Sequence, residues 1–130
     1  MTNIPKDRMY TKEHEWIKIE GEFGIIGITD YAQHALTDIV FVELPQKGKL
    51  VEQATRVTVV ESVKSVSDIY APMSGEIVEV NEALGRTPEN INQDPYGNGW
   101  IVKIKLSSMD QSKTLLDPEQ YEQYLKENQH

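Results

Sequence analysis

The stretch with the most suggestive chemistry runs from Val57 to Val80 and reads VTVVESVKSVSDIYAPMSGEIVEV. Polar residues between positions 61 and 68 separate two extended apolar runs, which is the pattern of a β-hairpin and its loop. Lys64 falls in this loop and is expected to project into solvent. A lysine amine can act as a nucleophile, which makes Lys64 a candidate functional residue. Exposed turn lysines are also common in proteins without such a role.

Other residue types limit the chemistry that the chain can perform alone. The sequence has no cysteine, so it excludes disulfides, thiolate metal sites and cysteine nucleophiles, and any thiol chemistry must come from an attached cofactor. The spacing of His14, His34 and His130 does not predict a metal site. No Ser/His/Asp signature, glycine-rich phosphate loop or metal cluster is present. We therefore expect a protein that is not an enzyme and holds no metal.

The charge of the chain points away from nucleic acid as a partner. The formal net charge is −8 and the pI is about 4.8, whereas a phosphate-binding surface needs clustered Lys and Arg. Residues 61–95 hold seven carboxylates against two cations. This acidic stretch either steers basic partners or only solubilises the protein. No apolar run is long enough for a membrane span and no secretory signal opens the sequence, so we expect a cytoplasmic protein.

Short strands are the elements that must position Lys64. Runs of β-branched and aromatic residues end at glycine, proline or polar turns, which is typical of strands. They lie at Glu15–Glu20, Phe23–Ile28, Asp38–Leu44, Thr55–Glu61, Gly75–Val80 and Trp100–Leu106. At least six strands at this spacing predict a mainly β fold, a two-sheet sandwich or flattened barrel, with residues 1–130 in one domain.

Two helices complete the predicted fold. A short helix is expected near residues 30–36, capped by Thr29 or Asp30. A C-terminal helix is expected over about 117–127. Its first turn has a capping residue, a proline and a capping-box partner: Asp117, Pro118 and Gln120. Its apolar stripe, which we expect to dock onto the sheet, contains Tyr121, Tyr124 and Leu125.

The sequence resembles the glycine cleavage H-proteins. Their lipoylation pattern places Glu three residues before the modified Lys and Gly eleven after it, the spacing of Glu61, Lys64 and Gly75. Further family motifs follow in the family order, namely YTKEHEW (10–16), GITDYAQ (27–33), DIVFVELP (38–45), YAPMSGEIVEVNEAL (70–84) and DPYGNGW (94–100) followed by IVKIK. The resemblance runs from about Tyr10 to Tyr124, nearly the whole chain.

The resemblance implies a fold of the lipoyl–biotinyl carrier type, with a carrier core at about 38–81, and a lipoyl group bound covalently to Lys64. Such a carrier moves the aminomethyl group of glycine from glycine decarboxylase (P-protein) to the aminomethyltransferase (T-protein), and dihydrolipoamide dehydrogenase (L-protein) reoxidises it. Lipoate-attachment enzymes are further partners. A carrier of this kind catalyses none of these steps alone.

The resemblance also implies roles for the neighbours of Lys64. Glu61 and Gly75 are expected to serve recognition by the lipoylating enzymes, and Val63 and Ser65 flank the modified lysine. H-proteins often have alanine at the two positions after this lysine, where the present chain has Ser65 and Val66.

A cleft that protects the loaded arm is implied as well. Its candidate acids are Glu15, in the HEW motif, and Asp68, four residues after the lysine. Either acid would pair with the amine of the loaded arm.

Related carriers are the main alternatives. Biotin carriers use the same hairpin-lysine design but place methionine on both sides of the lysine, where this chain has Val63 and Ser65. Lipoyl domains of 2-oxoacid dehydrogenases are shorter modules joined by flexible linkers to an acyltransferase, and neither feature is found here. A relay of lipoate to 2-oxoacid dehydrogenases stays open.

Overall fold

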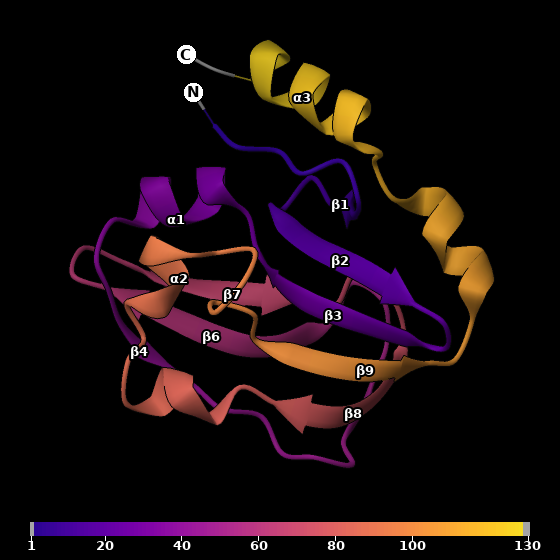
Figure 1. Ribbon diagram of the computed structural model, residues 1–130, viewed down its shortest axis with the longest axis horizontal. Helices are drawn as coiled ribbons and strands as arrows, with labels where there is room; N and C mark the ends of the chain where they lie inside the picture. The colour runs from indigo at the N-terminus through magenta and orange to yellow at the C-terminus, as the bar shows by residue number, and fades with distance from the viewer. Residues whose placement is uncertain (1, 129–130) are drawn as a thin grey trace.

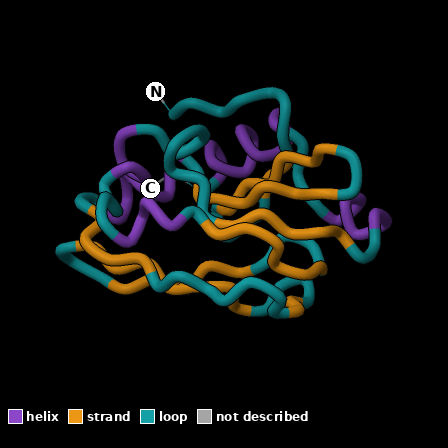
Figure 2. Tube along the Cα trace, turned by 60° about the horizontal axis from the view of Figure 1, so that its bottom comes forward, coloured by secondary structure: helices purple, strands orange, loops and turns teal. Residues whose placement is uncertain are grey.

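Strands dominate the molecule, as the short β-branched runs predict. The computed structural model describes residues 2–128 and contains two antiparallel sheets. The larger sheet has the order β1–β2–β3–β9–β8–β5, and the smaller has the order β4–β6–β7. Their bounds are β1 (Met9–Tyr10), β2 (Glu15–Glu20), β3 (Phe23–Ile28), β4 (Ile39–Val42), β5 (Leu50–Val51), β6 (Arg56–Ser62), β7 (Val66–Tyr70), β8 (Gly75–Val80) and β9 (Val102–Leu106). Figure 2 shows these strands forming the body of the molecule.

The two sheets pack face to face around one apolar core. Side chains from both sheets are fully buried in it, among them Ile17, Ile26, Val60, Ile77 and Ile104. The sheets stay separate and do not close on each other, which makes the fold a sandwich and not a closed barrel. The prediction of a mainly β, two-sheet fold is therefore confirmed.

The two predicted helices are present. α1 (Asp30–Leu36) begins after Thr29, whose hydroxyl accepts the N–H of Ala32 at 3.2 Å. α3 (Pro118–Glu127) begins with the predicted capping box, in which Asp117 and Gln120 exchange hydrogen bonds of 2.8 and 2.9 Å. Three short elements without a clear sequence signal also occur, namely η1 (Glu82–Gly85), α2 (Asn90–Gln93) and η2 (Met109–Thr114).

α3 packs against β1, the edge strand of the larger sheet, and Figure 1 shows it above β1 and β2. The ring of Tyr121 stacks on that of Tyr10, with centroids 4.7 Å apart. Its hydroxyl lies 2.9 Å from His14 Nδ1 and 2.8 Å from Thr29 Oγ1. The helix therefore fastens the turn before β2 to the start of α1.

The β6–β7 hairpin corrects one part of the sequence interpretation. The polar stretch 61–68 was expected to form a loop, but the turn contains only Val63, Lys64 and Ser65. Glu61 belongs to β6 and pairs with Val66, while Asp68 belongs to β7. Polar residues fit these strands because the outer face of an antiparallel sheet needs no apolar partner. The turn projects at the left edge of Figure 1.

No helix within residues 2–128 combines the length and the apolar character that crossing a bilayer demands. In the same described range, no three His, Asp or Glu side chains gather as metal ligands would.

Candidate functional site

Lys64 lies at the apex of the hairpin, exposed to solvent. Its neighbours Val63 and Ser65 are exposed as well. Within the described part of the chain, no carboxylate lies within salt-bridge distance of it. The structure thus presents the lysine as the sequence predicted, as a free side chain on a turn.

The turn itself is held by Ser62, a residue to which the sequence interpretation gave no role. Its hydroxyl accepts the N–H groups of Lys64 and Ser65 at 3.3 and 3.1 Å, and its own N–H donates to the Ser65 carbonyl at 2.8 Å. From the other side, the N–H of Val63 donates to the Asp38 carbonyl at 3.0 Å. The lysine therefore has a mobile side chain on a fixed backbone.

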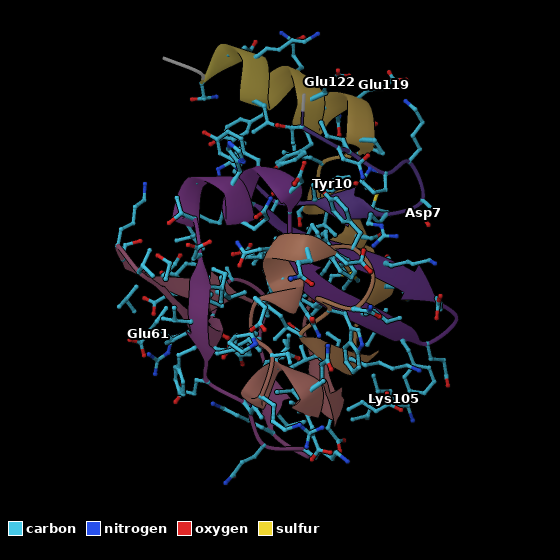
Figure 3. All side chains as sticks on the ribbon, turned by 60° about the vertical axis from the view of Figure 1, so that its left-hand side comes forward. Asp7, Tyr10, Glu61, Lys105, Glu119 and Glu122 are labelled. Carbon is cyan, nitrogen blue, oxygen red and sulfur yellow. The ribbon has the colours of Figure 1, made fainter. Side chains whose placement is uncertain are left out.

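Glu61 stands next to this turn on the outer face of the smaller sheet. It pairs with Phe41 of β4 on one side and with Val66 of β7 on the other. Residues that pair directly across strands share a face, so the half-buried carboxylate lies between two apolar side chains. Figure 3 labels Glu61 at the margin of the molecule.

Gly75 lies in the larger sheet, at the start of β8. Close packing against β9 explains why a glycine occupies this position. A Cβ at this position would lie 3.0 Å from the carbonyl carbon of Lys105 in β9 and closer still to the carbonyl oxygen. The backbones of β8 and β9 approach closely at this point, so packing alone favours glycine there. A role in recognition by a lipoylating enzyme stays a prediction for this residue.

Glu15 is a buried acid with a shifted pKa. Glu15 is only 1% exposed. Its carboxylate accepts one hydrogen bond from the Thr11 hydroxyl and another from the N–H of Tyr70, the latter at 3.1 Å. Burial raises the pKa of the Glu15 carboxyl from 4.5 to about 7, although the two hydrogen bonds act in the opposite direction. Near neutral pH this carboxyl therefore keeps its proton more readily than an exposed glutamate does.

A cavity of about 480 Å³ opens beside Glu15. It is lined by Thr11, Lys12, Glu13, Glu15, Gln53, Ala54, Tyr70, Ala71, Pro72, Thr114, Leu115 and Leu116. The lining combines the buried carboxyl of Glu15 with apolar side chains and with two further charged residues, Lys12 and Glu13. Thr11 and Tyr70 are functional candidates that the sequence interpretation missed, although Thr11 belongs to the YTKEHEW motif.

β7 connects the lysine turn to this cavity. Every second residue of a strand points to the same face, so one face of β7 carries Val66, Asp68 and Tyr70. Asp68 is half-exposed there, and its carboxylate lies 3.8 Å from Arg56 Nη1. The four residue steps from Val66 to Tyr70 span roughly 13 Å at the usual strand rise. Glu15 bonds to Tyr70 at the far end of β7, whereas Asp68 lies at the middle of the strand and outside the cavity lining. Lys64 lies beyond the other end of β7, so the structure does not bring the two predicted acids together.

Comparisons with known proteins identify the family of the chain. A model of the glycine cleavage H-protein family matches residues 8–128. The chain belongs to the glycine cleavage H-protein family. The family membership confirms the resemblance found in the sequence, and the full-length match favours it over a biotin carrier or a 2-oxoacid dehydrogenase lipoyl domain.

Individual members of the family are similar over their whole length. The glycine cleavage system H protein of a Thermus thermophilus strain is 59% identical over 123 residues, which covers 95% of this chain and 96% of that protein. The one from Carboxydothermus hydrogenoformans is 52% identical over 127 residues, with 98% of each chain covered. The crystal structure of a glycine cleavage system H protein from Mycobacterium marinum superposes with a TM-score of 0.84 at 42% identity, covering 96% of this chain and 98% of that one.

Proposed function

We propose that Lys64 is the sole attachment site of a lipoyl group, bound as N6-lipoyl-lysine. On this proposal the chain carries the aminomethyl group of glycine within the glycine cleavage system. The observation that carries it is the exposed Lys64 amine on a turn held by Ser62 and Asp38. Lipoamide supplies a dithiol–disulfide couple, which a chain without cysteine cannot supply itself.

The hairpin meets the requirements of covalent attachment. A bond must form between Lys64 Nζ and the lipoyl carbonyl carbon, while the group that activates the carboxyl leaves with its bonding electrons. Two of the three ammonium protons pass to solvent and the third stays on the amide nitrogen. An exposed side chain on a rigid turn can enter an enzyme's active site without unfolding the carrier. Attachment replaces an ammonium by a neutral amide, so the formal charge changes from −8 to −9.

The partners follow from this role. We assign the chemical steps to glycine decarboxylase, the aminomethyltransferase and dihydrolipoamide dehydrogenase, and attachment to lipoate-attachment enzymes in the same cytoplasm. The present chain acts as a non-catalytic carrier among them. A tethered group reaches an effective concentration on the order of millimolar once the carrier docks, which explains why a carrier is used in place of a free cosubstrate.

The cavity beside Glu15 is proposed as the resting place of the loaded arm. An arm that starts at Lys64 and follows the outer face of β7 passes Val66 and Asp68 before it reaches Tyr70 and the cavity. The carboxyl of Glu15 is already desolvated, so it would pair strongly with an ammonium group. Asp68 is half-exposed and is expected to contribute less.

The attachment site is tested by expressing the wild type and Lys64→Arg with a lipoate source and measuring intact mass. Lys64→Arg should lose the lipoyl increment entirely and keep its melting temperature, because the side chain is exposed. Lys49→Arg changes another exposed loop lysine and should keep the full increment. An undiminished adduct on Lys64→Arg would overturn the assignment.

A further inference from the structure

Exposed apolar side chains gather around Lys64. Phe41 of β4 is 51% exposed, Val63 in the turn is 66% exposed and Val66 of β7 is 64% exposed, and Val40 is exposed beside them. The inward-facing neighbours of these residues, such as Val42 and Val60, are fully buried in the core. The sandwich therefore does not use the outer residues for its own packing.

The strand register arranges these residues into a row. Phe41 pairs with Glu61, and Glu61 pairs with Val66, so one carboxylate stands between two apolar side chains on the outer face. The next outward pair is Val59 with Asp68. We call Phe41, Glu61, Val63 and Val66 the apical patch.

The length of the lysine side chain decides which partner must cover this patch. An enzyme that acts on a loaded arm can keep its active site at a distance from the turn, because the arm spans that distance. An enzyme that modifies the bare lysine must bring its active site to the lysine nitrogen itself, and so must enclose the turn. The residues beside the turn are then buried against it.

From this we infer that the apical patch is the docking surface for the enzyme that attaches the lipoyl group to Lys64. The inference rests on the proposed function. The patch fits a partner whose active-site mouth is apolar and carries one Lys or Arg. Burial of Phe41, Val63 and Val66 supplies affinity in proportion to the apolar area removed from water. The carboxylate of Glu61 would lose water at the same time, and only a cation opposite it offsets that cost.

The chemistry of the patch separates it from the rest of the surface. Leu50 in β5 is 76% exposed, more than any patch residue, but it lies in the other sheet and away from the hairpin. It is therefore a matched control. If exposed apolar area alone mattered, replacing Leu50 would have the same effect as replacing Phe41 or Val66.

The test measures attachment to the unmodified chain. A purified lipoate–protein ligase, lipoate and ATP are mixed with apo wild type, Phe41→Ser, Val66→Ser, the double variant and Leu50→Ser, and initial rates are read by intact mass. The double variant should lose roughly tenfold or more in kcat/KM, the size expected for truncating two anchors at an interface. Leu50→Ser should match the wild type. Val66→Thr, which keeps shape and strand propensity, should show a smaller loss in the same direction.

Charge is tested separately. Glu61→Gln should lower kcat/KM and reduce its dependence on salt, while Glu61→Lys should lower it much further, because like charges would then face each other. Glu76→Gln, an exposed acid on β8, is the matched control and should change neither quantity.

Equal attachment rates for the wild type and a folded double variant would overturn the proposal that the apical patch is the docking surface. A patch that instead joins two copies would show as a dimer of the wild type that the double variant loses in sedimentation, with attachment rates unchanged. If the wild type accepts no lipoyl group at all, the proposed function fails, and the docking surface fails with it. Should the double variant unfold, the rate for Val66→Thr decides.

Discussion

The carboxylate of Glu15 accepts the backbone N–H of Tyr70 at 3.1 Å and so joins β2 of the larger sheet to the last residue of β7 in the smaller one. An acid that is 1% exposed and bonded across two sheets is part of the fold as well as of the cavity. The same group is thus expected to respond to pH, to a bound amine and to the folding of the chain.

Replacing Glu15 should change how stability depends on pH. The folded carboxyl has a pKa of about 7, whereas the unfolded one ionises near 4.5. Between these values the folded state binds more protons, so the free energy of unfolding should fall as pH rises from about 4.5 to about 7. The fall should be roughly 3 kcal/mol, and Glu15→Gln should not show it. Urea unfolding of both proteins at pH 5, 6, 7 and 8 measures the difference.

Glu22→Gln, which changes an exposed acid in the turn before β3, is the control and should keep the slope of the wild type. A difference between wild type and Glu15→Gln that stays constant across this range would mean that Glu15 ionises as an exposed glutamate does.

Replacing Glu15 and Asp68, the two acids proposed to protect the loaded arm, should leave its amine more accessible to water. The aminomethyl-loaded wild type and its Glu15→Gln/Asp68→Asn variant are left without partner enzymes, and the release of ammonia or formaldehyde is followed. Release should be several-fold faster from the variant, because a desolvated ammonium–carboxylate pair is lost. Much of the binding should survive, since apolar burial contributes about 0.8 kcal/mol per methylene.

The control for this experiment replaces two exposed acids that do not line the cavity, Glu82→Gln and Glu89→Gln. Equal release from all three proteins would show that these acids do not guard the arm.

Ser62→Ala should loosen the lysine turn. The variant loses the hydroxyl that accepts from Lys64 and Ser65 and that donates to the Ser65 carbonyl at 3.2 Å. The free energy of unfolding should fall by about 1–2 kcal/mol. Hydrogen exchange of the Ser65 amide should accelerate, and lipoyl attachment should slow. Ser65→Ala removes an exposed hydroxyl and leaves these bonds intact, so it should match the wild type in stability and in exchange of the Ser65 amide. Unchanged exchange at Ser65 in Ser62→Ala would rule out the hydroxyl as the support of the turn.

Gly75→Ala should destabilise the fold. Its methyl group would meet the Lys105 carbonyl of β9, which is backbone and cannot move aside cheaply. A loss of roughly 1–3 kcal/mol is expected, as for other overpacked sites. Denaturant midpoints measure it. Gly85→Ala meets only the end of the Leu44 side chain, at 3.3 Å, and should cost less. A Gly75→Ala chain of normal stability that accepts lipoate slowly would favour recognition over packing.

Local signals predicted the elements that have clear ends. Strands at Glu15–Glu20, Phe23–Ile28 and Gly75–Val80 match β2, β3 and β8 residue for residue, since turn residues bound them. The capping box of α3 was equally readable. The polar stretch after Val60 misled because outer-face strand residues and loop residues have the same composition, and only pairing across strands distinguishes them.

Long-range contacts explain what the sequence did not reveal at the site. Glu15 was predicted as a cleft acid from the family motif alone, and its burial depends on Tyr70, which lies 55 positions later in the chain. Ser62 was visible as a polar residue near the lysine. Its bonds to Lys64 and Ser65 require the tight three-residue turn, which composition does not specify.

The position of β8 has a consequence for dissecting the chain. β8 lies between β9 and β5 in the larger sheet, and β9 in turn pairs with β3. A fragment cut at about 38–81, the predicted carrier core, would keep the lysine hairpin but leave the edge of β8 that pairs with β9 unpaired. Unpaired edges of this kind recruit strands from other molecules. Minimal carriers engineered from this chain should therefore keep β9 and the β2–β3 hairpin, or replace them with a designed cap.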